Sequence, residues 1–354
     1  NGNGGAVLVP DSNANTHVRM ANVVLSGNSA GGAVQFNGSG RLTIDHSTIS
    51  GNSGSDAAGV LVSGGELVIS SSTIRDNTAQ FGTGGIHTSA TTTTITASTV
   101  QHNVSQQCGV GGIFNSVGTL TITDSTIKDN ESNTSGGGLA TSGPTTLTRV
   151  TVSGNRTTFG DCGEGGGDAD GAGIASFGTL DVINSTISNN TAEGNGGGIS
   201  ARRPLTLSGS TVSENHADRG GGVNAIGNFV ATNSTISSNQ ATGEGGGIYI
   251  QSGSLRLSSV TIAGNSAHDG GGVFEAGDDS STFNTIIASN SGADCGGNGL
   301  VNTSNFNLDS DGTCNFNGTG NLTANPRLGP LANNGGTTFT HTLLAGSPAS
   351  DAGG

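Results

Sequence analysis

The chain has 354 residues, of which 65 are glycine, 31% are apolar and 3% are aromatic. The formal net charge of −14 is small for this length, so the composition does not favour a disordered chain. Collagen is excluded because there are only six prolines and glycine keeps no three-residue period. The acidic balance argues against a nucleic-acid partner, and no apolar stretch is long enough for membrane insertion.

An asparagine recurs along most of the chain at intervals of 24–27 residues, apart from one interval of 35 caused by an insertion around residues 161–170. A period of this length is typical of repeat proteins, in which each unit packs mainly against its neighbours. Eleven units cover roughly residues 5–290, and their asparagines are Asn28, Asn52, Asn77, Asn103, Asn130, Asn155, Asn190, Asn215, Asn239, Asn265 and Asn290.

Each unit contains three short stretches in which apolar and polar residues alternate, as in residues 196–199, 205–207 and 210–212. Alternation with period two indicates strands, and Gly, Asn and Ser separate them. Three short strands in about 25 residues predict one coil of a parallel β-helix, whose apolar residues stack on those of the next coil. The sequence therefore predicts an all-β solenoid of about eleven coils.

Two polar features mark the corners of the predicted coil. A run of glycines precedes the first strand of each unit, where a sharp turn needs positive φ. The recurring asparagine lies at the opposite turn, where its amide would hydrogen-bond between coils as an asparagine ladder. We expect residues 1–290 to form the β-helix, and residues 291–354 to form a C-terminal segment that packs on its end or extends it.

The repeat resembles those of polymorphic outer-membrane proteins. The C-terminal segment contains NLDSDGTC at residues 307–314, NPRLGPL at 325–331, NGG at 334–336 and GSPASDAG at 346–353. This arrangement is similar to the choice-of-anchor Q family of bacterial surface proteins. The resemblance implies a right-handed β-helix exported to the bacterial cell surface, with no known activity. Members usually continue into a variable anchor, so the mode of attachment stays open.

The four cysteines fit an extracellular protein, and the lack of any Cys-x-x-Cys pair argues against structural zinc. Four cysteines allow three pairings. We predict a bond between Cys295 and Cys314, which flank a compact stretch after the last repeat, and a bond between Cys108 and Cys162, which lie on long turns. The chain starts at Asn1 without a recognisable leader, so any signal peptide is expected to be removed already or to lie outside it.

Calcium is the one cofactor for which the sequence offers candidate ligands, and no other cofactor is indicated. Carboxylates gather in the glycine-rich insertion, and Ca²⁺ favours oxygen ligands on such loops. The candidates are Asp161, Glu164, Asp168 and Asp170, although a solvated acidic loop explains the same residues. Asp309 and Asp311 resemble the start of an EF-hand, but no glutamate follows at the twelfth position, so an EF-hand is excluded. The histidines share no register, so no catalytic residue is assigned.

A column of nine threonines lies four residues before the repeat asparagines and is expected on the outer face. Regular threonine arrays are used by ice-binding β-helices, whereas a plain threonine ladder on a sheet explains the same pattern. The members are Thr48, Thr73, Thr99, Thr126, Thr151, Thr186, Thr211, Thr235 and Thr261.

A carbohydrate-active β-helix, either a polysaccharide lyase or a hydrolase, is a second alternative. Its candidate basic cluster is Arg202, Arg203, Arg219 and Arg256. The chain has no tryptophan and a single tyrosine, Tyr249, although exposed Trp and Tyr are what sugar subsites favour. Convergence of these arginines with a carboxylate in one groove would support an enzyme.

The sequence favours a secreted or cell-surface, non-enzymatic β-helix that acts as a structural or adhesive element outside the cell. Surface glycans are candidate partners, and a second copy of the chain is another. Residues 337–344 form an extended stretch that could pair with the N-terminal strand edge of another copy. Such a contact joins two different surfaces, and it would therefore propagate into filaments.

Overall fold

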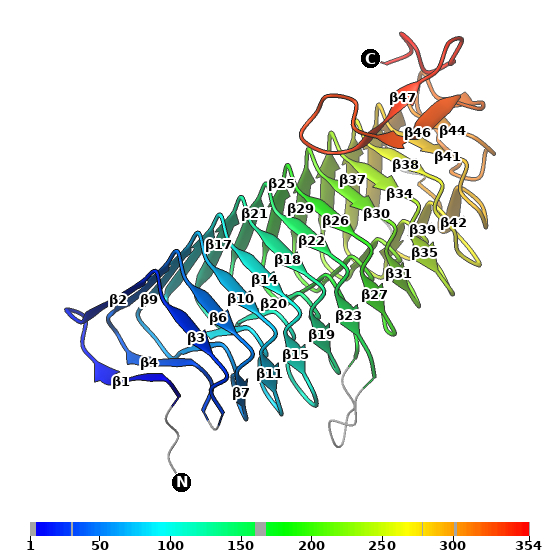
Figure 1. The fold of residues 1–354 in the computed structure, drawn as a ribbon. Coiled ribbons are helices and arrows are strands. Elements are labelled where there is room, and N and C mark those ends of the chain that lie inside the picture. Colours follow the sequence, from blue (N-terminus) through cyan, green and yellow to red (C-terminus); the bar gives the residue numbers. More distant parts are fainter. Residues whose placement is uncertain (1–4, 30, 160–167, 278, 301–302, 354) are drawn as a thin grey trace. The chain divides into compact units, whose positions relative to one another are not determined.

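The computed structural model describes residues 5–29, 31–159, 168–277, 279–300 and 303–353. The chain divides into two compact units, residues 1–179 (unit 1) and residues 180–354 (unit 2), and each is described by itself. The described residues form an all-β parallel solenoid of about twelve turns and contain no helix (Figure 1). Accordingly, no helix there is long and apolar enough to cross a membrane.

In unit 1 each coil contributes one strand to each of three long parallel sheets, A, B and C, and most coils add a two-residue strand to a fourth sheet, D. Sheet A contains β1 (Val7–Ser12), β4 (Val34–Gly38), β8 (Val60–Val62), β12 (Ile86–Thr88), β16 (Ile113–Asn115), β20 (Leu139–Thr141) and β24 (Ile174–Ser176). Sheet B contains β2 (His17–Ala21), β5 (Arg41–Asp45), β9 (Glu66–Ser70), β13 (Thr92–Thr96), β17 (Thr119–Thr123) and β21 (Thr145–Thr148). Sheet C contains β3 (Val24–Ser26), β6 (Thr48–Ser50), β10 (Thr73–Arg75), β14 (Thr99–Gln101), β18 (Thr126–Lys128) and β22 (Thr151–Ser153). Sheet D contains β7 (Ser53–Gly54), β11 (Thr78–Ala79), β15 (Val104–Ser105), β19 (Glu131–Ser132) and β23 (Arg156–Thr157).

Unit 2 repeats this arrangement and ends in an antiparallel hairpin of β46 (Leu328–Ala332) and β47 (Thr340–Leu343). Its sheet A strands are β28 (Ile199–Ala201), β32 (Val223–Ala225), β36 (Ile248–Ile250), β39 (Val273–Glu275) and β42 (Cys295–Gly297). Its sheet B strands are β25 (Leu180–Ile183), β29 (Leu205–Ser208), β33 (Phe229–Thr232), β37 (Ser254–Ser258), β40 (Asp279–Phe283) and β43 (Thr303–Asn305). Its sheet C strands are β26 (Thr186–Ser188), β30 (Thr211–Ser213), β34 (Thr235–Ser237), β38 (Thr261–Ala263), β41 (Ile286–Ala288), β44 (Leu308–Asp309) and β45 (Leu322–Thr323). Its sheet D strands are β27 (Thr191–Ala192), β31 (His216–Ala217) and β35 (Gln240–Ala241).

The core consists of columns of like residues, because successive coils pair in register. In sheet C of unit 1, for example, Ile49 pairs with Ile74, and Ile74 pairs with Val100. These side chains are almost fully buried, and the residues that alternate with them point outward. Alternation with period two therefore places one apolar column behind each sheet, and stacking removes it from water.

One detail differs from the predicted coil. The sheet D strands were not anticipated, since a two-residue strand is too short to produce a periodic signal. Past residue 290 the coils continue to stack, because β42 pairs with β39, β44 with β41, and β45 with β44. This extension accounts for the difference between eleven predicted coils and about twelve observed.

Candidate functional site

The repeat asparagines are buried and hydrogen-bonded from coil to coil. The Oδ1 atom of Asn77 accepts the backbone N–H of Asn52 at 3.1 Å and its side-chain Nδ2 at 2.8 Å. Asn77 in turn donates from Nδ2 to Asn103 Oδ1 at 2.9 Å and to the Ile49 carbonyl at 3.1 Å. The pattern runs from Asn28 to Asn155 in unit 1 and from Asn190 to Asn290 in unit 2. It supplies partners for turn groups that would otherwise be buried unpaired.

A second ladder, made by serines five residues before the asparagines, was not predicted. Ser47 N donates to Ser72 Oγ, and Ser72 N donates to Ser98 Oγ, both at 3.1 Å. Each hydroxyl also donates to a carbonyl two residues earlier, as Ser72 does to Ser70 at 2.7 Å. The signal was present, because serine precedes the threonine in most units. Both ladders link the turns of successive coils by hydrogen bonds. We therefore assign them a structural role.

Carboxylates replace asparagine where the repeats end. Asp294 Oδ1 accepts both Asn290 N and Asn290 Nδ2, at 3.1 and 2.9 Å. Asp309 accepts Cys314 N at 3.0 Å, and Asp311 accepts Asp294 N at 2.9 Å. Burial raises the pKa of Asp309, although the hydrogen bonds it accepts act in the opposite direction. These aspartates cap the last coils, which explains the resemblance of 309–312 to the start of a calcium loop.

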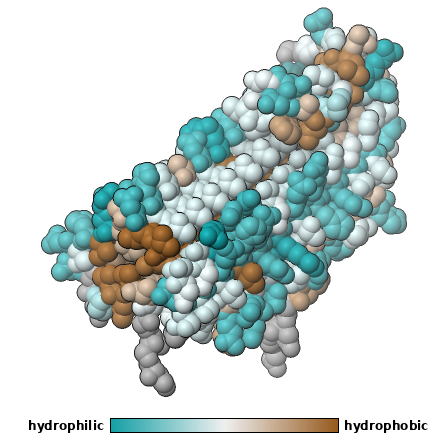
Figure 2. Space-filling model, in the orientation of Figure 1, coloured by the Kyte–Doolittle hydropathy of each residue, from teal (hydrophilic) through white to brown (hydrophobic). Residues whose placement is uncertain are grey.

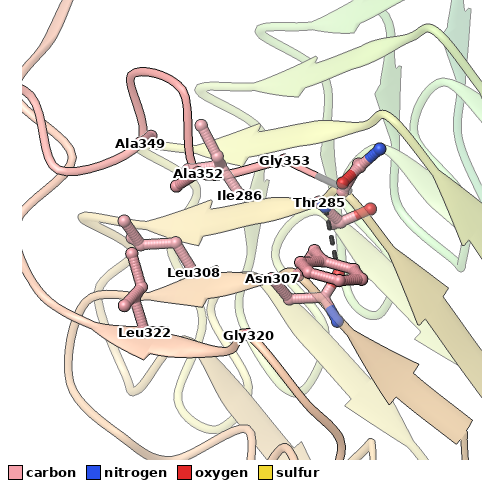
Figure 3. Close-up of a pocket in the computed structure, with 11 residues that line it drawn as sticks. Thr285, Ile286, Asn307, Leu308, Gly320, Leu322, Ala349, Ala352 and Gly353 are labelled. Carbon is pink, nitrogen blue, oxygen red and sulfur yellow. Dashed lines mark hydrogen bonds between the residues drawn. The ribbon is translucent and has the colours of Figure 1, made fainter.

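The end of the chain covers the last sheet C strands. In Figure 3, Ala352 and Gly353 lie next to Ile286, and Leu308 and Leu322 follow on the neighbouring strands; these residues line a pocket of about 80 Å³. Residues 349–353 thus cover apolar side chains that would otherwise be exposed to water at the end of the core. The pocket is too small for a ligand beyond a few atoms and belongs to the packing of the end.

The hairpin of β46 and β47 lies on the outer face of sheet C in unit 2 (Figure 1). Thr211 Oγ1 donates to the Phe339 carbonyl at 2.7 Å, and Thr338 Oγ1 donates to the Gly209 carbonyl at 3.1 Å. His341 lies between Ser237 Oγ at 2.9 Å and the Gly329 carbonyl at 2.7 Å. Because that carbonyl only accepts, Nδ1 of a neutral His341 carries the proton and Nε2 accepts from Ser237.

The threonine column is therefore not a uniformly exposed array. Thr211 and Thr235 are buried, although both were expected on an open outer face. Of the others, Thr151 is exposed, and Thr48, Thr73, Thr99, Thr126, Thr186 and Thr261 are half-buried. The expectation was wrong for the two buried members. At Thr211 the reason is the terminal hairpin, whose packing the sequence does not reveal. The covered positions interrupt the flat surface that ice binding requires.

We expect Thr211→Val to lower the free energy of unfolding by about 1 kcal/mol, since the Phe339 carbonyl loses its donor. Thr186→Val, the register partner one coil earlier, is the control and should change it by much less. Denaturant unfolding measures both, and limited proteolysis around residues 333–339 should accelerate only in the Thr211 variant. Equal effects would place the hairpin elsewhere.

Two of the four arginines proposed for a carbohydrate-active groove, Arg219 and Arg256, form separate ion pairs. Arg219 Nε lies 2.6 Å from Glu244 Oε2, because their coils stack directly on each other. Arg256, in β37 of sheet B, lies 2.8 Å from Asp279. Arg202 and Arg203 lie in the turn between β28 and β29. Arg219 and Arg256 thus pair with different carboxylates, an arrangement that does not favour the single groove this alternative needs.

Among the calcium candidates, Asp161 and Glu164 lie outside the described residues. Asp168 is exposed and Asp170 is buried, with its backbone N–H donating to Ser135 Oγ at 3.3 Å. Within the described part of the chain, no group of three or more His, Cys, Asp or Glu side chains is placed to hold a metal ion. Calcium binding at the insertion stays a prediction.

One of the two predicted disulfides is confirmed. Cys295 and Cys314 are bonded, with their Cα atoms 4.8 Å apart. Cys108 is also disulfide-bonded, and its predicted partner Cys162 lies outside the described residues.

Unit 1 carries a pocket of about 510 Å³ that the sequence did not predict. Its floor is the outer face of sheet A, where His87, Phe114 and Ala140 occupy equivalent positions on adjacent strands. The rings of His87 and Phe114 lie with centroids 5.0 Å apart. Phe114 also packs against a small buried cluster with Val110 and Ala140. The small side chain of Ala140 on the strand next to Phe114 leaves a hollow on the outer face of the sheet.

Turns from successive coils form the wall of this pocket. Phe81 lies in the turn before β12, and Asp56 in the turn before β8. The backbones pack so closely that a Cβ added at Gly82 would lie 1.7 Å from the Asp56 carbonyl oxygen. Thr83 N donates to that same oxygen at 2.9 Å, which holds Asp56 in place. Phe177, after β24, adds a further exposed ring.

The sequence does carry a signal for this pocket. The residue after each Gly-Gly-aliphatic motif points outward from sheet A, and this series contains His87 and Phe114 in unit 1 and Tyr249 and Phe274 in unit 2. Aromatic residues at exposed positions are costly to leave in water, so they favour a binding role. The turns of neighbouring coils decide which of these aromatic residues line a pocket, and the sequence pattern does not show how those turns pack.

Burial lowers the pKa of His87, and the nearby Asp56 carboxylate opposes this shift without cancelling it. His87 therefore stays neutral in the folded protein at a pH where an unfolded histidine already binds a proton. Below about pH 6.5 the unfolded state gains protons first, so folding stability falls on acidification. We expect His87→Gln to reduce this loss between pH 7.5 and 5.5, measured by denaturant unfolding. The exposed His268→Gln is the control, and equal pH profiles for wild type and His87→Gln would contradict the prediction.

Comparison with known proteins agrees with this fold. Residues 1–157 match the family model described as a right handed beta helix region. The predicted parallel β-helix is confirmed, and a β-helix of this kind serves enzymes as well as non-enzymatic proteins. No curated protein and no solved structure matches the chain. The narrower resemblance to the choice-of-anchor Q family stays a prediction.

Proposed function

We propose that the protein is a secreted or cell-surface adhesive β-helix that binds a surface polymer without transforming it. The pocket of unit 1 is the observation that carries this proposal. It combines exposed rings, a carboxylate and a volume suited to one or two residues of a polymer. Its walls belong to stacked coils, so the site needs little reorganisation on binding.

Two further features support an extracellular location. The disulfide between Cys295 and Cys314 is chemistry that persists in oxidising surroundings. The coil-to-coil ladders of buried asparagines and serines leave few turn groups unpaired, which suits a chain exposed to proteases outside the cell. We propose that the polymer that the protein binds is a surface glycan.

Adhesion of coated beads tests the proposal. Beads carrying the purified protein are expected to be retained on bacterial cells and on immobilised envelope polysaccharides. The double variant Phe81→Ser, Phe177→Ser should lose most of this retention, because it removes two exposed rings from the pocket. Phe283→Ser in unit 2 is the control, since its side chain is 39% exposed, the same fraction as Phe177.

Equal retention of the pocket variant would contradict the proposal. Release of cleaved or otherwise modified polymer by the wild-type protein would also contradict it, and would favour the lyase or hydrolase alternative.

Assembly of copies into filaments is a separate proposal. The terminal hairpin matters for it, because the hairpin contains the segment expected to pair with a second copy. Residues 337–344 hydrogen-bond to unit 2 of their own chain, through Phe339, Thr338 and His341. A second copy would have to displace these contacts to use the same segment. Figure 2 shows another apolar area, over the first coil, where Leu8 and Val24 are exposed. Sedimentation of the intact chain and of a chain lacking residues 337–344 tests whether that segment contributes to assembly.

A further inference from the structure

The two units use the same place in the coil differently, and this difference indicates what the pocket binds. The position four residues before the first core residue of sheet A is Arg219 in one coil of unit 2 and Glu244 in the next. Arg219 forms an ion pair with Glu244 and lies over the ring of Tyr249, 5.7 Å from its centroid. In unit 2 the chain itself therefore places a cation between a carboxylate and an aromatic ring.

In unit 1 the equivalent positions carry Asp56, Gly82 and Gly109 in three successive coils. The ring of Phe114 stands where Tyr249 stands in unit 2, so Gly109 and Gly82 hold the places of Glu244 and Arg219. The carboxylate of Asp56 lies one coil before Gly82. Neither glycine marks an empty side-chain site, because a Cβ at Gly82 or Gly109 would lie 1.7 or 1.9 Å from a carbonyl oxygen of the preceding coil. The pocket lies beside these turns, and its described lining contains no lysine or arginine.

The charge of the described lining is accordingly negative. Asp56 contributes an exposed carboxylate, and His87 stays neutral because burial lowers its pKa. The rings of Phe81, Phe114 and Phe177 line the same hollow. A carboxylate beside several aromatic rings attracts a cation that carries alkyl groups. The carboxylate attracts its positive charge, and the rings attract the charge and contact the alkyl groups.

We propose that the pocket of unit 1 binds an alkylated ammonium group, which meets a carboxylate and aromatic rings there as the Arg219 guanidinium does in unit 2. Asp56 supplies the counter-charge, and Phe81, Phe114 and Phe177 surround the alkyl groups. A neutral sugar would satisfy the rings but leave the carboxylate without a charged partner, and an anion would be repelled. The inference rests on the proposed function only in using the same pocket, and it names the chemical group that the surface polymer carries.

Calorimetric titration of the intact chain tests the inference with three probes: choline, its neutral isostere 3,3-dimethylbutan-1-ol, and methyl β-glucoside. Choline is expected to bind at least about tenfold more tightly than the isostere. Asp56→Asn should weaken choline binding about tenfold and leave binding of the isostere unchanged. Asp181→Asn, which removes one exposed carboxylate in unit 2, is the matched control and should have no effect.

The rings are tested with Phe114→Leu, which should weaken choline binding more than binding of the isostere. If this variant does not fold, amide shifts in the wild-type protein replace it, and choline should move the signals of Thr83, Val110 and Ala140. Equal affinity for choline and the isostere, or shifts at other residues, would overturn the inference.

Other outcomes separate the inference from the proposed function. Binding of the glucoside without binding of choline would overturn the inference and leave adhesion intact. Choline binding with the expected Asp56 dependence, but without retention of coated beads, would uphold the inference and reject the adhesive function. Failure of all three probes to bind would overturn the inference.

Discussion

Asn215→Ala is expected to lower the free energy of unfolding by about 3 kcal/mol or more. The Asn215 side chain accepts the backbone N–H and the Nδ2 group of Asn190, at 3.0 and 2.9 Å. It donates to the Ile187 carbonyl at 3.0 Å and to Asn239 Oδ1 at 2.9 Å. Alanine leaves several of these buried groups without a partner, and each such group costs about 1–3 kcal/mol.

Denaturant unfolding followed by circular dichroism measures this effect. Gln251→Ala is the control, because that side chain is exposed and the substitution should leave stability nearly unchanged. Thr211→Val provides an intermediate case, since it removes one hydrogen bond to the hairpin instead of four in the ladder. If Asn215→Ala unfolds at the wild-type midpoint, the ladder does not stabilise the coils.

Replacing Cys295 and Cys314 together with alanine is expected to cost about 3 kcal/mol. The bond closes a segment with a sequence separation of 19, and a loop of that size restricts the unfolded chain by about this amount. Both cysteines are buried, and the backbone N–H of Cys314 donates to Asp309 at 3.0 Å. The effect should centre on the last coils, which this segment builds.

Two measurements check the location of the effect. Unfolding without reductant gives the total loss, and limited proteolysis should show earlier cleavage within residues 296–313 than elsewhere. Adding reductant to the double variant isolates the contribution of the bond at Cys108, which the substitution leaves in place. A double variant as stable and as protease-resistant as the wild type would show that the closed segment does not stabilise these coils.

Sequence pattern alone was enough for the coil. An apolar residue at every second position, repeated after about 25 residues, has a low-energy arrangement only if each coil covers its neighbour. Ile49, Ile74 and Val100 are therefore stacked as the alternation predicts. The asparagine ladder could also be predicted from the sequence, because an amide side chain both donates and accepts hydrogen bonds and can therefore bond to its equivalents in the coils on either side.

Contacts between distant segments could not be predicted in the same way. Thr211 and Thr186 have the same place in the repeat, yet only Thr211 is buried, since the hairpin 128 residues further along the chain packs on it. Nothing local to Thr211 encodes that packing. The exposed-face interpretation of the column was therefore right about direction and wrong about burial at this position.

The sequence by itself determined the β-helix, the direction of its core residues and the disulfide between Cys295 and Cys314. These properties follow from period, alternation and short spacing, which are local or strictly repeated. Only the tertiary structure decided which outward residues meet. The pocket of Asp56, Phe81 and Phe114 depends on how the turns of successive coils stack and on the small side chain of Ala140 beside Phe114. The repeat period does not encode either of these.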